Sequence, residues 1–101
     1  MNSSVGSSFG IAAFRSRTQV LRLEEALRRA GIDAGVISTP REVAIGCGLS
    51  VRFPLSAAAQ VMAVCRRLAP AALIGFYRVE GYGTRSLRLS PLMTGAPRGA
   101  G

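Results

Sequence analysis

The sequence contains no histidine and no lysine, and all 13 of its basic residues are arginine. The absence of histidine removes the commonest general base and the commonest metal ligand. Only five acidic residues oppose the arginines, so the formal net charge is +8. A glycine-rich phosphate loop and a paired-carboxylate site are also missing. The sequence therefore predicts neither a bound metal nor a cofactor.

Cysteine is scarce. Cys47 and Cys65 lie 18 positions apart and form no C-x-x-C motif, which is typical of neither a disulfide framework nor a zinc site. The N-terminal stretch has no basic segment ahead of its apolar run, as a signal peptide would have, and no apolar run approaches the length of a membrane span. We therefore expect free thiols in a cytoplasmic protein that does not associate with membranes.

With 101 residues, 49% hydrophobic and 18% charged, the chain is expected to form one small globular domain. Residues 1–8 are rich in serine and glycine and predict a flexible leader. Residues 81–101 are rich in glycine and proline, carry three arginines and no acid, and predict a flexible tail. The folded unit is thus expected over residues 9–80. A core this small would gain stability from a partner or from a second copy of the chain.

Short apolar runs predict four strands, at residues 9–14, 32–38, 48–53 and 71–79. Apolar residues at helical spacing predict one helix between Ser16 and Gly31 and another over residues 57–68. Ser16 and Gln19 have the spacing of a capping box, Gly31 is a typical helix stop, and Ser56 is expected to cap the second helix.

The resulting β-α-β-β-α-β order predicts an α+β fold, a ferredoxin-like sandwich. Its four-stranded antiparallel sheet would carry both helices on one face, and the second and third strands would form a hairpin. The residues expected in the core are Val20, Leu23, Leu27, Val51, Val61, Leu68 and Ile74.

The most informative stretch is Thr39–Phe53, TPREVAIGCGLSVRF, because it places Cys47 between Gly46 and Gly48. Flanking glycines free the backbone and leave the sulfur uncovered, so that backbone N–H groups could turn toward it. Such a cysteine suits a reactive thiol, although a free cysteine can also be a small buried hydrophobe. By contrast, Cys65 shares the apolar face of the second helix and is expected in the core.

Charged residues that could act on the thiol come from three segments. Nearby arginine lowers a thiol pKa, and the candidates are Arg41, Arg52 and Arg78. Glu42 could accept the thiol proton, although the Pro40-Arg41-Glu42 tripeptide could equally serve only to order its loop. Alternation along the third strand places Arg52 on the face away from the helices, where Arg78 is expected beside it. A solvated face with scattered arginines is the alternative interpretation.

The same stretch resembles the family of putative Se/S carrier-like proteins. The resemblance extends over residues 9–80 and is carried by Pro40-Arg41-Glu42, Cys47-Gly48 and Arg52-Phe53, with Tyr77-Arg78 near its end. It implies a domain whose cysteine holds sulfur or selenium as a persulfide or selenosulfide. Such a protein would be a carrier rather than a true enzyme, with donor and acceptor proteins as partners. Ser50 and the tail look like local variation, and the tail has no counterpart in the family pattern.

Two other functions are compatible with the residues. A net charge of +8 on a ferredoxin-like sheet also suits nucleic-acid binding. However, RNA-binding sheets of this topology place aromatic residues on the open face of the central strands, whereas the third strand offers Ser50 and Arg52 there. We therefore expect no specific nucleic-acid recognition. The remaining possibility is a regulatory module that pairs its sheet with that of a second copy.

Overall fold

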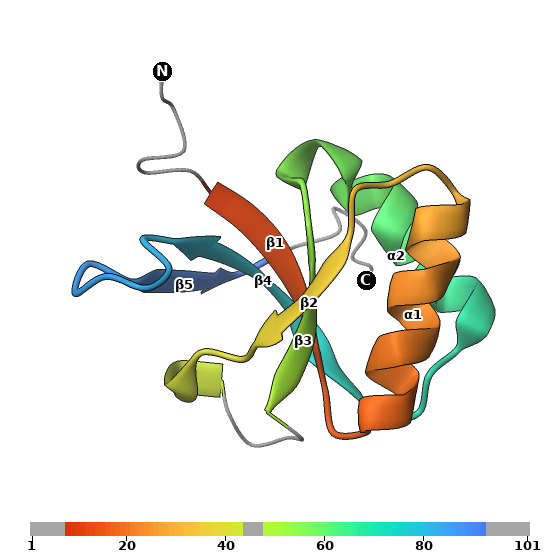
Figure 1. Ribbon diagram of the computed structural model, residues 1–101, viewed down its shortest axis with the longest axis horizontal. Coiled ribbons are helices and arrows are strands. Elements are labelled where there is room, and N and C mark those ends of the chain that lie inside the picture. Colours follow the sequence, from red (N-terminus) through yellow and green to blue (C-terminus); the bar gives the residue numbers. More distant parts are fainter. Residues whose placement is uncertain (1–7, 44–47, 93–101) are drawn as a thin grey trace, which may run out of the picture.

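The computed structural model describes residues 8–43 and 48–92 and has an α+β fold (Figure 1). Both helices lie on one side of an antiparallel sheet. The strands are β1 (Ser8–Phe14), β2 (Gly35–Ser38), β3 (Leu49–Phe53), β4 (Leu73–Glu80) and β5 (Arg88–Pro91). The helices are α1 (Arg17–Arg29) and α2 (Ala58–Leu68), accompanied by the short 3₁₀ turns η1 (Arg41–Val43) and η2 (Leu55–Ala57).

The sheet has five strands in the order β2-β3-β1-β4-β5. Every neighbouring pair is antiparallel, and the predicted hairpin of β2 and β3 is confirmed. The prediction of four strands is wrong because β5 pairs with β4 along the edge of the sheet. This strand lies inside the segment predicted to be a flexible tail. Its Arg-Leu-Ser-Pro sequence has little strand propensity, so pairing with β4, rather than local preference, accounts for it.

Helix α1 begins and ends as its sequence predicts. The Ser16 hydroxyl accepts a hydrogen bond from the N–H of Gln19 at 3.3 Å, while the Gln19 side chain accepts from the N–H of Ala72 at 2.8 Å and so ties the helix to the start of β4. Gly31 has φ +83°, and the N–H of Ile32 reaches back to the carbonyl of Leu27 at 3.0 Å. These bonds form a Schellman motif, in which glycine adopts the left-handed conformation without the steric strain that a Cβ would cause.

Helix α2 begins differently from the prediction. Its N-cap is Ala57, which makes no side-chain capping bond, so the prediction that Ser56 caps the helix is wrong. Instead, the N–H of Ala57 donates to the carbonyl of Pro54 at 2.9 Å. The η2 turn thus supplies a hydrogen-bond partner for a backbone N–H at the start of the helix. At the other end Ala69 adopts a left-handed conformation with φ 48°, which ends the helix although the residue is not glycine.

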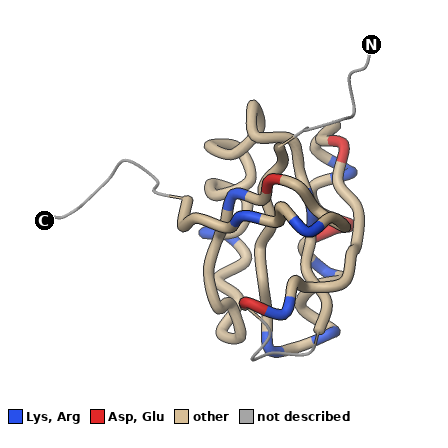
Figure 2. Tube along the Cα trace, turned by 90° about the vertical axis from the view of Figure 1, so that its left-hand side faces the viewer, with Lys and Arg blue, Asp and Glu red and all other residues tan. Residues whose placement is uncertain are grey.

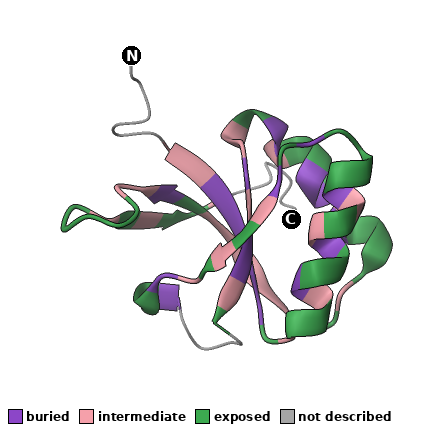
Figure 3. Ribbon diagram, in the orientation of Figure 1, coloured by how far each residue is buried: buried purple, intermediate pink, exposed green. Residues whose placement is uncertain are grey.

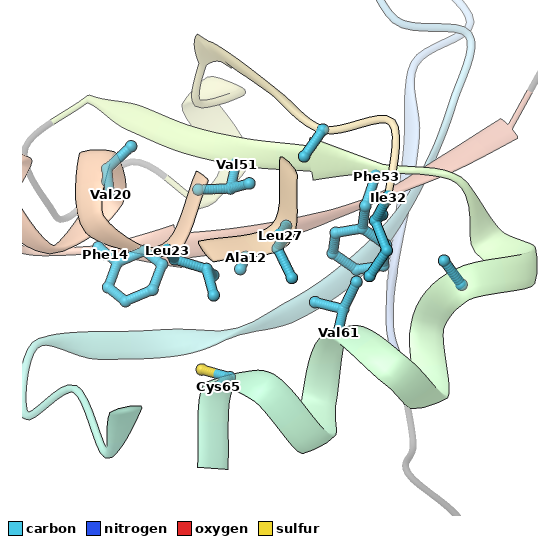
Figure 4. Close-up of a cluster of buried hydrophobic side chains, with 12 residues drawn as sticks. Ala12, Phe14, Val20, Leu23, Leu27, Ile32, Val51, Phe53, Val61 and Cys65 are labelled. Carbon is cyan, nitrogen blue, oxygen red and sulfur yellow. The ribbon is translucent and has the colours of Figure 1, made fainter. Parts of the chain in front are cut away.

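The main core lies between the helices and one face of the sheet (Figure 4). It contains Phe14 and Ala12 of β1, Val51 and Phe53 of β3, and both helix stripes. Five of the seven predicted core residues are fully buried: Val20, Leu23, Leu27, Val51 and Val61.

Two core predictions are wrong. Leu68 is the last residue of α2 and is 38% exposed. Ile74 is only partly buried because the β1–β4 register shifts between Ala13 and Phe14, so that Phe14 pairs with Leu73. Such an irregularity changes which side chains of a strand point inward. Leu73, rather than Ile74, packs against the core.

The sheet face away from the helices is also buried at its centre. In Figure 3 much of β1 is coloured as buried. Its central residues Ile11, Ala13, Ser50 and Val79 are all 0% exposed. Tyr82, which follows β4, packs its ring edge-to-face on Phe9 at 5.7 Å and donates its hydroxyl to the carbonyl of Ser38 at 3.0 Å. Because β3 and β1 lie between β2 and β4, this bond means that the segment after β4 reaches across that face to the end of β2.

We expect the Tyr82 hydroxyl to contribute measurably to stability. Tyr82→Phe keeps the ring contact but removes the bond to Ser38, and should lower the free energy of unfolding by about 0.5–1 kcal/mol. Tyr77→Phe is the matched control, since the Tyr77 hydroxyl has no hydrogen-bond partner within the described part of the chain. Urea unfolding of both variants measures the difference. Equal stability of the two variants would show that the Tyr82 bond is not formed in solution.

Candidate functional site

The predicted site lies in the loop that joins β2 to β3. Its base is closed where the N–H of Thr39 donates to the carbonyl of Gly48 at 2.9 Å, next to the registered pair Ser38 and Leu49. Within the loop the N–H of Val43 donates to the carbonyl of Pro40 at 2.9 Å and forms η1. Pro40 and Val43 are buried, so the first half of the loop is anchored by its own apolar residues.

Two predicted site residues, Gly46 and Cys47, lie outside the described residues. Their neighbour Gly48 has φ +85°, a conformation that residues with a Cβ rarely adopt. An added Cβ there would meet no atom within 4 Å. Glycine is therefore required at position 48 by its backbone conformation rather than by crowding, and it sets the direction in which the chain enters β3.

A buried pair of hydroxyls fixes the base of the loop. Thr39 Oγ1 and Ser50 Oγ are 2.6 Å apart, and Ser50 is wholly buried. A buried hydroxyl without a partner would destabilise the fold, so each hydroxyl here satisfies the other. The sequence predicted that Ser50 is local variation. Alternation along β3 placed it correctly on the face away from the helices, but its burial depends on tertiary contacts of that face, for which the sequence gives no signal.

Of the four charged residues of the predicted site, Arg41 and Glu42 lie in the loop, whereas Arg52 and Arg78 lie in strands, and arginine is spread over the chain (Figure 2). Arg41 and Glu42 lie in η1, and both are exposed. Arg52 pairs with Gly35, at the end of the hairpin away from the loop. The Arg52 guanidinium covers that glycine, since an added Cβ on Gly35 would lie 2.9 Å from Arg52 Nη2.

Arg78 lies on the opposite face of the sheet from Arg52. Its partner in β1 is Gly10, which in turn pairs with the core residue Phe53, whereas Arg52 pairs with Ile11. Arg78 forms an ion pair with Glu80 at 3.2 Å. The prediction that Arg52 and Arg78 lie side by side on one open face is therefore wrong, because cross-strand partners always point to the same face.

The second cysteine lies in the core, as its helical spacing predicts. Cys65 is 3% exposed and belongs to the main cluster (Figure 4). It lies at the bottom of an open apolar groove of about 550 Å³, which is also lined by Met62, Leu73 and Phe76. Burial raises the pKa of the Cys65 thiol by desolvation of its charged form. This thiol is therefore neutral at pH 7 and poorly nucleophilic.

The described residues contain no cluster of three or more metal-ligating side chains. Within residues 8–43 and 48–92, no helix combines the length and the apolar character that crossing a bilayer demands.

A comparison with protein families supplies one match. The profile of the family described as "Putative Se/S carrier protein-like" matches residues 9–71, well over half of the chain. The matched region runs from β1 to the segment after α2 and includes the whole loop between β2 and β3. Tyr77 and Arg78, which also resemble the family in sequence, lie beyond its end. No curated protein and no solved structure matches the chain.

The burial of Cys65 leads to a prediction on pH. Because the pKa of its thiol is raised in the folded state, its contribution to stability is complete below the unfolded thiol pKa of about 8.5 and is lost as the pH rises above that value. Urea unfolding between pH ~7 and ~10 should therefore show stability falling more steeply in the Cys47→Ser protein than in the protein that also carries Cys65→Ala. The Cys65→Ala change itself should cost about 1 kcal/mol at neutral pH. Parallel pH profiles would contradict the burial of this thiol.

Proposed function

The chain belongs to the family of putative Se/S carrier-like proteins, and on this premise we propose that it holds one sulfur or selenium atom on Cys47 and passes it to a partner protein. The observation that carries the proposal concerns the other cysteine. Cys65 is buried and its pKa is raised, so it is unsuited to exchange with another protein. Cys47 stands in the loop that the family match includes, and the carrier role therefore falls to it.

The transfer follows ordinary thiol exchange. The Cys47 thiolate attacks the outer sulfur of a donor persulfide, a bond forms between the two sulfurs, and the donor's inner sulfur leaves as a thiolate. Cys47 then carries the persulfide, and an acceptor nucleophile attacks its outer sulfur and releases the Cys47 thiolate. No net oxidation occurs in either step. In this proposal the protein only holds and delivers the atom, so it acts as a carrier.

The geometry of the loop supports this role. Its base is held by the Thr39–Gly48 bond at 2.9 Å and by the Thr39–Ser50 hydroxyl pair. Arg41 and Glu42 are exposed within the same loop, and we assign them, with Gly46 and Gly48, to the surroundings of the thiol. Arg41 would favour the thiolate by its positive charge, and Glu42 could accept the thiol proton.

In this proposal Arg52 and Arg78 do not contact the sulfur and act only through their charge. The Arg52 backbone is three residues along β3 from Leu49, about 10 Å at the rise of a strand. That distance is close to the screening length at physiological salt. Arg78 lies on the other face. We therefore infer that both contribute to the general positive potential that attracts an anionic sulfur species or an acidic partner, rather than touching the sulfur.

The proposal also covers the type of fold and the cellular compartment. Strands β1–β4 with α1 and α2 are best interpreted as a ferredoxin-like unit, to which β5 is added at the β4 edge. A carrier thiol must stay reduced when it is unloaded, which suits the cytoplasm rather than an oxidising compartment.

Loading is tested by incubating the protein with a cysteine desulfurase and free cysteine. Intact mass should rise by the mass of one sulfur atom, and a thiol reductant should remove the gain. Cys47→Ser should abolish loading because it removes the nucleophile. Cys65→Ala is the matched control, and it should load as the unaltered protein does.

Loading that persists in Cys47→Ser and disappears in Cys65→Ala would overturn the assignment of the carrier thiol. Loading of neither thiol, with the desulfurase shown to be active on another acceptor, would overturn the carrier function itself.

The nucleic-acid alternative gains no support from the sheet. On the face where RNA-binding sheets present aromatic rings, Ile11 and Ala13 of β1 are aliphatic and 0% exposed. Phe9 is packed against Tyr82, and Tyr77, which pairs with Ile11, is partly buried. We predict that any binding of single-stranded RNA depends on charge alone. In a filter-binding titration, affinity should fall by more than about tenfold between ~50 and ~200 mM salt and should not depend on sequence. A salt-resistant, sequence-selective complex would favour this alternative.

A further inference from the structure

The surface where α1 and α2 meet has two hollows separated by one leucine. We call it the helix seam and define it by Arg22, Ala26 and Arg29 of α1 and Val64, Arg67 and Leu68 of α2. The three α1 residues recur at spacings of four and three, which places them on one side of the helix. Both helices lie on the same side of the sheet (Figure 1), and this seam faces away from it.

The two hollows lie between side chains of α1 and α2. One, of about 180 Å³, lies between Arg22 and Leu68. The other, of about 400 Å³, lies between Ala26 and Arg29 on one side and Arg67 and Leu68 on the other. Alanine at position 26 leaves space that a larger side chain would fill. The dividing residue, Leu68, is 38% exposed, although its spacing along α2 matches that of the core residues Val61 and Cys65.

The charges at the seam are positive and mostly unopposed. Glu25 pairs with Arg29 at 3.0 Å, but Arg22 and Arg67 form no ion pair with any residue that the structure describes. Leu68 is therefore flanked by two arginines that can accept new partners. Arginine presents several N–H donors in a fixed plane and binds carboxylates through two hydrogen bonds.

We infer that the helix seam binds an acidic segment of a partner protein that carries an apolar side chain between its carboxylates. The apolar side chain would enter a hollow against Leu68, and carboxylates on either side of it would pair with Arg22 and Arg67. The charge complementarity identifies the partner as acidic, and the apolar residue at the centre identifies it as a protein. A nucleic-acid backbone offers anionic groups but no aliphatic side chain to cover Leu68.

This inference is independent of the sulfur chemistry, and its test uses no sulfur donor. The ¹⁵N-labelled protein is titrated with three synthetic peptides, acetyl-EDELEDE-amide, acetyl-EDEGEDE-amide and acetyl-QNQLQNQ-amide. The first should shift the amide resonances of the seam most strongly and with the highest affinity. Removing the leucine or the charges should weaken binding by at least about fivefold, since both contribute to binding.

Three variants locate the binding. Arg22→Glu combined with Arg67→Glu should weaken binding of the acidic leucine peptide by at least about tenfold. Ala26→Leu should weaken it without any change of charge, because it fills a hollow. Arg85→Glu combined with Arg88→Glu is the matched control, because it changes the net charge by the same amount and both residues are exposed, in the turn before β5 and in β5 itself. It should leave the affinity within about twofold. Heteronuclear spectra of each variant verify that the fold is retained.

Two outcomes would overturn the inference. In one, resonance shifts are spread over all exposed arginines, or the control with Arg85→Glu and Arg88→Glu weakens binding as much as the variant with Arg22→Glu and Arg67→Glu does, so that net charge alone is responsible. In the other, a single-stranded RNA oligonucleotide shifts the seam resonances more strongly than the acidic leucine peptide at the same salt concentration, which would assign the seam to nucleic acid.

Discussion

The fold depends on burying β1 from both sides. Ile11, Ala12, Ala13 and Phe14 are all between 0% and 1% exposed, and because side chains alternate along a strand, neither face of the sheet can be left open at its centre. Helices α1 and α2 cover Ala12 and Phe14. No helix within residues 8–43 and 48–92 covers the other face, and Tyr82 reaches across it to contact Phe9 and Ser38. The described part of this small domain thus buries both faces of its central strand with helices on one side.

The parts of the fold that could be predicted from sequence are those that depend on neighbouring residues alone. Ser16 and Gly31 act through local backbone chemistry, so the limits of α1 could be predicted from neighbouring residues alone. The hairpin of β2 and β3 is equally local. In contrast, β5 is held by pairing with β4, and nothing in its own composition distinguishes it from a flexible segment. The faces of Arg52 and Arg78 depend on the β1–β3 and β1–β4 registers, which are tertiary properties. Leu68 has the correct helical spacing for the core, but the helix ends there.

The candidate site likewise contains features that could be predicted from one continuous segment and features that depend on tertiary contacts. The glycine-flanked cysteine, its loop and the preceding Pro40-Arg41-Glu42 could be found in the sequence, since they form one continuous segment. The Thr39–Ser50 hydroxyl pair could not, because it joins the start of the loop to β3 through side chains eleven positions apart. For Cys65 the structure gives a physical reason why it is unsuited to thiol exchange. Cys65 is desolvated among apolar side chains, which disfavours its thiolate.

The described part of the β2–β3 loop lies apart from the proposed docking surface on the helices. The described part of the loop, Thr39–Val43 and Gly48, lies at the end of the β2–β3 hairpin, while α1 and α2 lie on the other side of the sheet (Figure 1). A partner held at the helix seam would therefore leave the loop uncovered. Binding strength could then depend on Arg22, Arg67 and Leu68 without altering the environment of Cys47. A carrier must meet both a donor and an acceptor, and for such a protein a docking surface distinct from the reacting atom allows recognition and transfer to be tuned separately.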